Sequence, residues 1–129
     1  MEAAQQKNAA AAAAAGENVP LELKPEIEYA DFEKIDFRVG TILEAKKHPD
    51  ADKLLVFKVK MGTETRQIVS GVAKIFKPEE LIGKKVIVVA NLKPRALRGQ
   101  ESKGMLLFAE SGEKFELVTT EAEDGNVVR

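Results

Sequence analysis

The segment KKVIVVA, residues 84–90, restricts the fold more than any other part of the sequence, because four β-branched apolar residues follow one another in it. A run of this kind, without polar alternation, is typical of a β-strand that is buried on both faces. Residues 57–61 instead alternate apolar and lysine side chains with a period of two, which indicates a half-buried strand. The sequence therefore predicts a β-rich fold in which residues 84–90 form an interior strand.

The order of the predicted elements favours one particular barrel. The pattern predicts a helical turn capped by Asp31, strands, a short helix that begins at Pro78, and further strands. The predicted strands cover residues 37–47, 57–61, 66–72, 84–90 and 104–109, with a sixth short one at 114–118, and Gly40 is expected to mark a bulge. Three strands, a helix and two more strands is the order of the OB-fold, an all-β, five-stranded Greek-key barrel with a short helix between strands three and four.

Length and composition divide the chain into a tail and one domain. The 129 residues allow a single domain of ordinary size. Residues 1–30 are rich in Ala and Glu and contain prolines, so they are predicted to be a flexible, disordered linker, and residues 31–129 are predicted to be the OB-fold domain. The sequence has no cysteine, which indicates a reducing compartment. It also has no predicted membrane span, and we expect a cytoplasmic protein.

The charge distribution points to a polyanion as ligand. Residues 34–103 hold sixteen basic and eight acidic side chains, whereas acids predominate on both sides of this region. OB-folds bind ligands along strands two and three, between two loops that correspond here to KHPDADK and NLKPRALRGQESK. The second loop carries four cations and one acid, so it is the predicted site. A solvated lysine-rich surface is the alternative explanation of the same charges.

Catalytic, metal and cofactor chemistry finds little support in the residue pattern. His48 is the single histidine, and no cysteine nucleophile or glycine-rich phosphate loop occurs. His48, Asp50 and Asp52 have the spacing of a turn more than that of a metal site. We therefore expect no catalytic residues, metal or cofactor. Because aromatic residues that could stack on bases are few, a folded RNA bound through phosphates and shape is favoured.

Three long motifs carry a family resemblance. DFEKIDFRVGTILEAKKHPDADKL, TRQIVSGVAKIFKPEELIGKKVIVVANLKP and RGQESKGMLL resemble the tRNA-binding domain appended to aminoacyl-tRNA synthetases, over residues 31–129. Within that family the chain most resembles the C-terminal domain of bacterial methionyl-tRNA synthetase. Related modules also occur as free-standing tRNA-binding dimers and as chaperone-like or cytokine-like proteins, so a protein-interaction module of the same fold is the alternative function.

The resemblance implies a non-catalytic OB-fold module that grips the outer corner of folded tRNA without reading its sequence. It also implies a homodimer and a covalently linked catalytic domain of methionine–tRNA ligase, whose nucleotide motifs are absent from this chain. The family motifs and the basic loop together give the predicted tRNA-binding residues Arg38, Lys53, Arg66, Ser70, Asn91, Lys93, Arg95, Arg98, Ser102 and Lys103. For Asn91 and Ser102, turn geometry is the alternative role.

Apolar residues beyond the predicted barrel also suggest a dimer. Phe115, Leu117, Val127 and Val128 follow the fifth strand and need either a partner or a packing surface on their own barrel. Packing against a partner predicts a homodimer, and packing on the chain's own barrel is the alternative.

Overall fold

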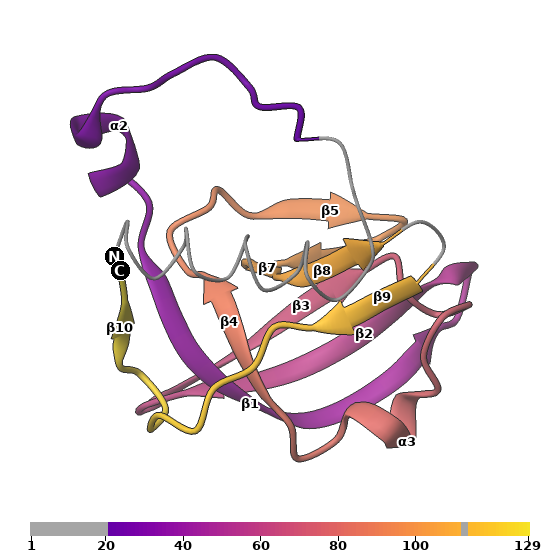
Figure 1. The fold of residues 1–129 in the computed structure, drawn as a ribbon. Coiled ribbons are helices and arrows are strands. Elements are labelled where there is room, and N and C mark those ends of the chain that lie inside the picture. Colours follow the sequence, from indigo (N-terminus) through magenta and orange to yellow (C-terminus); the bar gives the residue numbers. More distant parts are fainter. Residues whose placement is uncertain (1–20, 112–113) are drawn as a thin grey trace.

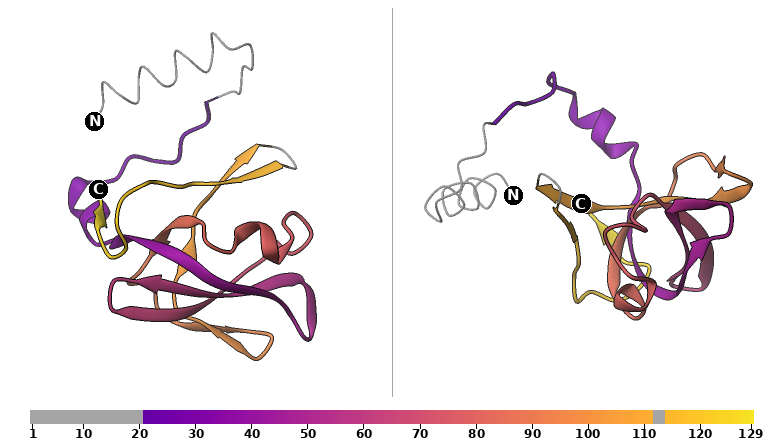
Figure 2. Two further views of the ribbon diagram at one scale, coloured as in Figure 1. Left: turned by 90° about the horizontal axis from the view of Figure 1, so that it is seen from below. Right: turned by 90° about the vertical axis from the view of Figure 1, so that its right-hand side faces the viewer.

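The structure is a computed structural model that describes residues 21–111 and 114–129. Most of the predicted linker lies outside the described residues. The predicted barrel is present: a main antiparallel sheet has the strand order β3-β2-β1-β4-β7, and β10 pairs with the first residues of β1. Figures 1 and 2 show the strands curling around one interior. No helix in the described part of the chain is long and apolar enough to cross a membrane.

The elements follow the predicted order closely. The helices are α2 (Tyr29–Glu33) and α3 (Pro78–Leu81), and the strands are β1 (Phe37–His48), β2 (Ala51–Met61), β3 (Glu64–Ser70), β4 (Lys85–Val89), β5 (Arg95–Leu97), β6 (Gln100–Ser102), β7 (Met105–Leu106), β8 (Phe108–Ser111), β9 (Lys114–Leu117) and β10 (Val127–Val128). The predicted helix at Pro78 and the interior strand at residues 84–90 are confirmed. The fold is therefore the expected OB-type barrel.

β4 needs an unbroken run of apolar residues because both of its faces are buried. Val86 and Val88 belong to the barrel core, which also contains Phe57 and Ile68. Ile87 and Val89 point to the opposite side of the strand and are nevertheless only 5% and 8% exposed. Each buried side chain of this size stabilises the fold by roughly 1.5–3 kcal/mol. Both faces of β4 are covered, as the sequence predicted.

The barrel closes along a seam between β3 and the segment formed by β6 and β7, where the sheet itself is not continuous. One backbone bond crosses this seam, from Lys103 N–H to Gln67 O at 2.9 Å. Side chains supply the other bonds. Ser102 Oγ accepts a hydrogen bond from Val69 N–H at 3.0 Å, and Arg66 donates to the carbonyl oxygens of Ala90 and Lys103.

The C-terminal segment returns to the start of β1 and is fixed there by an ion pair. Asp124 accepts hydrogen bonds from Thr41 Oγ1 at 2.6 Å and from Lys85 Nζ at 2.8 Å. Burial acts to raise the pKa of this carboxyl, but the hydrogen bonds from Lys85 and Thr41 outweigh burial and hold the pKa below its ordinary value of 3.8. The carboxylate is thus stabilised in its charged form, and it anchors the segment that leads into β10.

Four local expectations need correction. Asp31 lies inside α2, where its carboxylate accepts from Glu28 N–H, so the helix begins earlier than residue 32. The register shifts in β1 fall between Ile42 and Glu44 and between Lys47 and His48, not at Gly40. Gly40 is required instead by close packing, because a Cβ there would lie 2.7 Å from Val59 Cγ1. The other two differences concern the segment 91–103 and the predicted fifth strand.

The segment 91–103, expected to be an irregular polar loop, contains the β5–β6 hairpin. The predicted fifth strand at 104–109 is divided between β7 and β8, and β8 pairs with β9 outside the main sheet. Phe115 and Leu117 of β9 pack against the barrel core, which is the alternative placement considered from the sequence. Of the four apolar residues that suggested a dimer, only Val127 is exposed.

Candidate nucleic-acid interface

Three segments far apart in the sequence meet at one end of the barrel, on the right of Figure 1. They are the turn between β1 and β2, the loop that follows β3, and the β5–β6 hairpin. Together they surround an open hollow of about 540 Å³, lined by Asp50, Ala51, Asp52, Lys53, Leu54, Lys74 and Arg98. We call this region the loop end. The predicted first and second loops are therefore brought together, as the OB-fold requires.

The hairpin presents its cations on a tight two-residue turn. Arg98 and Gly99 connect the paired residues Leu97 and Gln100, and both turn residues have positive φ, 54° and 88°. This is the backbone pattern of a type I′ turn, whose twist matches that of the strands. Arg95 and Arg98 are exposed on this hairpin, and Lys103 is exposed just after it with an ion pair to Glu101 at 3.5 Å.

The turn and the hairpin exchange side-chain hydrogen bonds. The His48 ring at the end of β1 is 4% exposed, and its Nε2 lies 3.0 Å from Leu97 O. Asp50 N–H donates to His48 Nδ1 at 2.9 Å. In return, Arg98 donates to Asp50 O at 3.1 Å. The two loops are thus connected to each other at the edge of the hollow.

A polar path leads from the loop end across the outer face of β2 and β3. Lys58 Nζ donates to Gln67 Oε1 at 3.1 Å. The Gln67 amide in turn donates to Gln100 Oε1 and to Glu101 O at 3.2 and 3.0 Å. Sequence reasoning did not select Lys58, Gln67 or Lys74. The period-two alternation in β2 could have identified Lys58 as facing outward, whereas Lys74 is placed at the hollow only by the fold.

The ten predicted site residues separate into two groups. Five members are exposed cations: Lys53 and Arg98 line the hollow, Arg95 lies on the β5–β6 hairpin, Lys103 follows it, and Lys93 lies between β4 and β5. Ser70 ends β3 opposite Leu55 and is partly exposed. In the other four, Arg38, Arg66, Asn91 and Ser102, polar side-chain atoms are hydrogen-bonded to other groups of the protein. For all ten residues, contact with tRNA stays a prediction.

Arg66 and Ser102 belong to the seam described above. Ser102 is 4% exposed, accepts from Val69 N–H and donates to Gly104 O at 3.1 Å. This placement agrees with the structural role considered for Ser102 from the sequence. Arg66 is half-buried, and besides the two carbonyl oxygens its guanidinium contacts Glu64.

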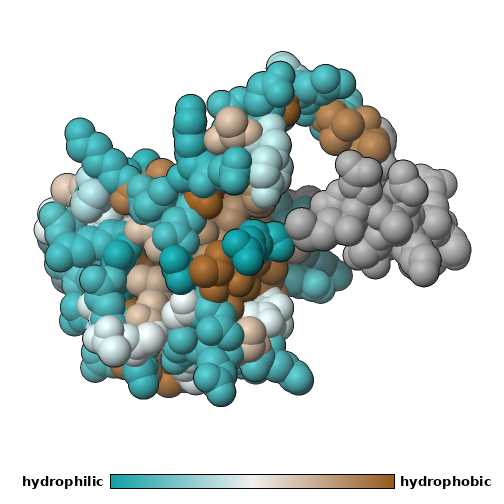
Figure 3. All heavy atoms as spheres, turned by 90° about the vertical axis from the view of Figure 1, so that its left-hand side faces the viewer, coloured by the Kyte–Doolittle hydropathy of each residue, from teal (hydrophilic) through white to brown (hydrophobic). Residues whose placement is uncertain are grey.

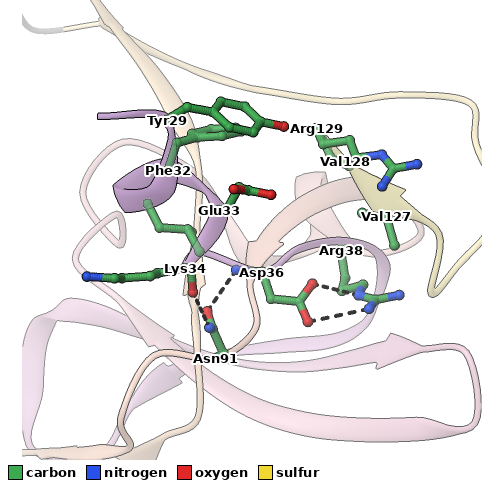
Figure 4. A pocket seen from close by; sticks show the side chains of 11 residues that line it. Tyr29, Phe32, Glu33, Lys34, Asp36, Arg38, Asn91, Val127, Val128 and Arg129 are labelled. Atoms are coloured by element: carbon green, nitrogen blue, oxygen red, sulfur yellow. Dashed lines mark hydrogen bonds and ion pairs between the residues drawn. The ribbon is translucent and has the colours of Figure 1, made fainter. Parts of the chain in front are cut away.

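Arg38 and Asn91 lie at the opposite end of β1, beside α2 and β10, as Figure 4 shows. Arg38 donates to Asp36 Oδ1 at 2.7 Å and to Gly125 O at 3.0 Å. Asn91 donates to Lys34 O at 2.6 Å and accepts from Asp36 N–H at 2.9 Å. These bonds hold the segment after α2 against the end of β4. The structure therefore does not bring Arg38 and Asn91 together with the basic loops.

This second region, which we call the α2–β10 face, has an apolar surface. It contains a hollow of about 440 Å³ whose lining includes Tyr29, Phe32, Ile35 and Val127. Tyr29 is 69% exposed and Val127 is 49% exposed. Figure 3 views the molecule from this side and shows apolar side chains gathered among hydrophilic ones. An uncovered apolar surface of this kind is typical of an interaction site.

None of the described residues that line the hollow at the loop end is aromatic. Phe57 is fully buried, and Phe76, Phe108 and Phe115 pack on one another and on the core. At the α2–β10 face, Phe32 contacts both Tyr29 and Phe37. The loop end therefore offers cations and backbone groups to a ligand but no ring on which a base could stack.

An OB-type barrel whose loop end presents cations is an arrangement found in proteins that bind polyanions. Residues 37–127 match the model of the family described as "Putative tRNA binding domain". The chain belongs to this tRNA-binding domain family, which confirms the resemblance found in the sequence.

Curated relatives are methionine–tRNA ligases. The chain is 53% identical over 97 residues to the enzyme of Pyrococcus horikoshii and 55% identical over 101 residues to that of Flavobacterium johnsoniae. These matches cover 75% and 78% of this chain but only 13% and 14% of the two ligases. The domain is therefore homologous to a small part of each ligase.

Two solved structures are similar throughout their length. The methionyl-tRNA synthetase related protein of Pyrococcus horikoshii is 38% identical with a TM-score of 0.78, and the match covers 82% of this chain and all of that one. The CsaA chaperone protein of Picrophilus torridus is 31% identical with a TM-score of 0.75, and the match covers 81% of this chain and all of that one.

Proposed function

We propose that this chain is a non-catalytic module that recognises folded tRNA by its shape and phosphates. The observation that carries the proposal is the loop end, where three segments place Lys53, Lys74 and Arg98 around one hollow, and Arg95 and Lys103 are exposed on the hairpin and just after it. Cations on a rigid scaffold can follow the phosphates of a structured RNA. Asp50 and Asp52 also line the hollow.

The proposal is tested by measuring the affinity of the chain for tRNA over a range of salt concentrations. If about four to six phosphates are neutralised, the logarithm of the affinity falls with the logarithm of the salt concentration with a slope of roughly −3 to −5. Several tRNA species should bind with similar affinity, and a single-stranded RNA of the same length should bind more weakly. A flat salt dependence would contradict the proposal.

In the parent protein, we propose that this module is the C-terminal tRNA-binding and dimerisation domain of a cytoplasmic methionine–tRNA ligase. The identity to two such ligases supports this assignment. The catalytic domain would then be covalently linked and would supply methionine activation, while this domain would add affinity for tRNA. Continuous synthetase sequence in the same reading frame, upstream of residue 1, would support the assignment.

We also propose a homodimer formed through the α2–β10 face. Ile27, Tyr29 and Val127 are each about half exposed or more on or near this face, and they surround polar groups that are already paired internally. Apolar side chains beside satisfied polar groups suit a self-complementary contact, because few unpaired polar atoms need to lose water. The dimer would place two loop ends on one particle.

A second candidate function is protein interaction, and the similarity to the CsaA chaperone protein favours it. Such a module would bind an unfolded or apolar segment rather than tRNA. The two functions differ in the physical basis of binding. An apolar peptide contact would be nearly independent of salt, whereas the phosphate contacts proposed here are not.

A further inference from the structure

The bonds between the β1–β2 turn and the β5–β6 hairpin are reciprocal. His48 Nε2 contacts a backbone oxygen of the hairpin, Leu97 O, at 3.0 Å. Arg98 of the hairpin contacts a backbone oxygen of the turn, Asp50 O, at 3.1 Å. The two loops are separated by about fifty residues in the sequence, and each therefore holds the main chain of the other.

The partners of His48 determine its tautomer. Asp50 N–H can only donate, so His48 Nδ1 must be the acceptor at 2.9 Å. Leu97 O can only accept, so the proton of the neutral ring must be on Nε2. Both ring nitrogens are thus used by a single neutral form of a side chain that is 4% exposed. This arrangement leaves His48 no donor or acceptor for a ligand.

Arg98 gives an independent indication that the hairpin is held in one position. Its φ of 54° is in the left-handed region, and Arg98 is the one described residue other than glycine with a positive φ. This conformation is unfavourable for a residue with a Cβ, and type I′ turns usually place Asn or Gly there. The guanidinium of Arg98 reaches Asp50 O with one nitrogen, and its other N–H groups make no hydrogen bond within the described part of the chain, so they are available to a phosphate.

We infer that His48 is a positioning residue for tRNA binding, which locks the β1–β2 turn to the β5–β6 hairpin so that their cations form one preorganised surface. The inference rests on the proposed function. Two separately mobile loops would have to be ordered when tRNA binds, and the lost entropy would weaken the complex. With the lock in place, Lys53 on one side and Arg98 on the other are held around the same hollow before the ligand arrives.

Two substitutions separate the bond within the turn from the bond between the loops. In His48→Asn, the amide oxygen stands at the position of Nδ1 and can still accept from Asp50 N–H as in an Asx turn, but nothing reaches Leu97 O. In His48→Gln, the amide nitrogen stands at the position of Nε2 and can still donate to Leu97 O. Both variants remove the ring and keep the net charge of the neutral histidine, so each is the matched control for the other.

The experiment measures tRNA affinity and amide hydrogen exchange for wild type, His48→Asn and His48→Gln. We expect His48→Asn to bind tRNA about five- to tenfold more weakly and His48→Gln to stay within about threefold of wild type. Exchange within residues 95–102 should accelerate in His48→Asn, while exchange in the β1–β4 core stays slow. Equal affinity in wild type and His48→Asn, or an equal loss in both variants, would overturn the inference.

Two further outcomes distinguish the proposed function from the lock, by which we mean the bond of His48 that joins the β1–β2 turn to the β5–β6 hairpin. If wild type did not bind tRNA, the proposed function would fail and the role of His48 in binding would fail with it, whereas the exchange data would still judge the lock. If His48→Asn did not fold, the nitrogen chemical shifts of the wild-type ring would decide. A proton on Nε2 and an unprotonated, hydrogen-bonded Nδ1 support the lock, and the opposite tautomer excludes it.

Discussion

The two ends of β1 use the same kinds of side chain for different purposes. At the loop end, Arg95, Arg98 and Lys103 are exposed and the buried polar contacts connect one loop to another. At the α2–β10 face, the guanidinium of Arg38 and the amide of Asn91 bind backbone and carboxylate groups, and apolar side chains are left exposed. Residue type alone therefore does not identify a ligand contact. The free hydrogen-bonding capacity of the side chain distinguishes the two ends.

The largest effect is expected from neutralising the loop end. Arg95, Arg98 and Lys103 changed together to alanine should weaken tRNA binding by about 100-fold, or about 2.7 kcal/mol, and reduce the salt slope by about 2–3. The control removes three exposed lysines elsewhere, Lys24, Lys84 and Lys114, and should change affinity by less than about threefold. Filter binding measures both. Equal losses in the two triple variants would show that binding is not localised.

The second effect concerns the α2–β10 face. Val127→Asp places a charge on the exposed apolar surface and should weaken dimerisation by at least about 30-fold, because the carboxylate would lose water on association. Equilibrium sedimentation at tens of micromolar should then give the monomer mass. Val127→Thr, which has a similar shape, is the control and should keep more of the dimer. A monomeric wild type would remove the proposed dimer.

The third effect tests the two roles considered for Ser102. Ser102→Ala leaves Val69 N–H without its acceptor at the seam, which should lower the free energy of unfolding by about 1–2 kcal/mol. Affinity for tRNA, measured well below the melting temperature, should stay near the wild-type value. A loss of affinity without a loss of stability would instead make Ser102 a tRNA contact.

The smallest effect is the acid sensitivity of the C-terminal anchor. Because the pKa of Asp124 in the folded chain lies below 3.8, the charged carboxylate stabilises the fold at higher pH, and this stabilisation is lost as the pH falls below 3.8 through the folded pKa. Asp124→Asn should lower the free energy of unfolding by about 1 kcal/mol at pH 7 and by less at pH 2. Denaturant unfolding at both pH values checks this, and a constant difference would contradict it.

The fold was largely predictable because it depends on local patterns. Three short patterns each predict a local structure: the apolar run predicts β4, the alternation predicts β2, and Pro78 predicts the start of α3. The β5–β6 hairpin lacks such a signal, since its strands contain no β-branched residue and its turn is Arg-Gly rather than the usual Asn-Gly. β10 is only two residues long and is defined by its pairing with β1.

The candidate site was predictable only in part. Clustered charge placed the second loop at the site, and the structure brings it to the hollow beside Lys53. From the sequence, Arg66 and Ser102 were indistinguishable from residues that bind a ligand. In the structure they form hydrogen bonds to backbone groups that lie 24 to 37 residues away. Hydrogen bonds over such separations depend on the closed barrel, so local sequence patterns do not reveal them.

The seam between β3 and the β6–β7 segment is a weak contact between neighbouring segments of the barrel. β2 and β3 share seven paired positions and β1 and β4 share five, whereas the seam has one backbone bond and a few side-chain bonds. Under a pulling force or during a thermal fluctuation, β3 should separate from the β6–β7 segment before any other pair of neighbouring segments does, and the barrel should open there. The four-stranded sheet β3-β2-β1-β4 would stay paired while the hairpin moves away, so a ligand that contacts both sides of the seam would stabilise the closed barrel.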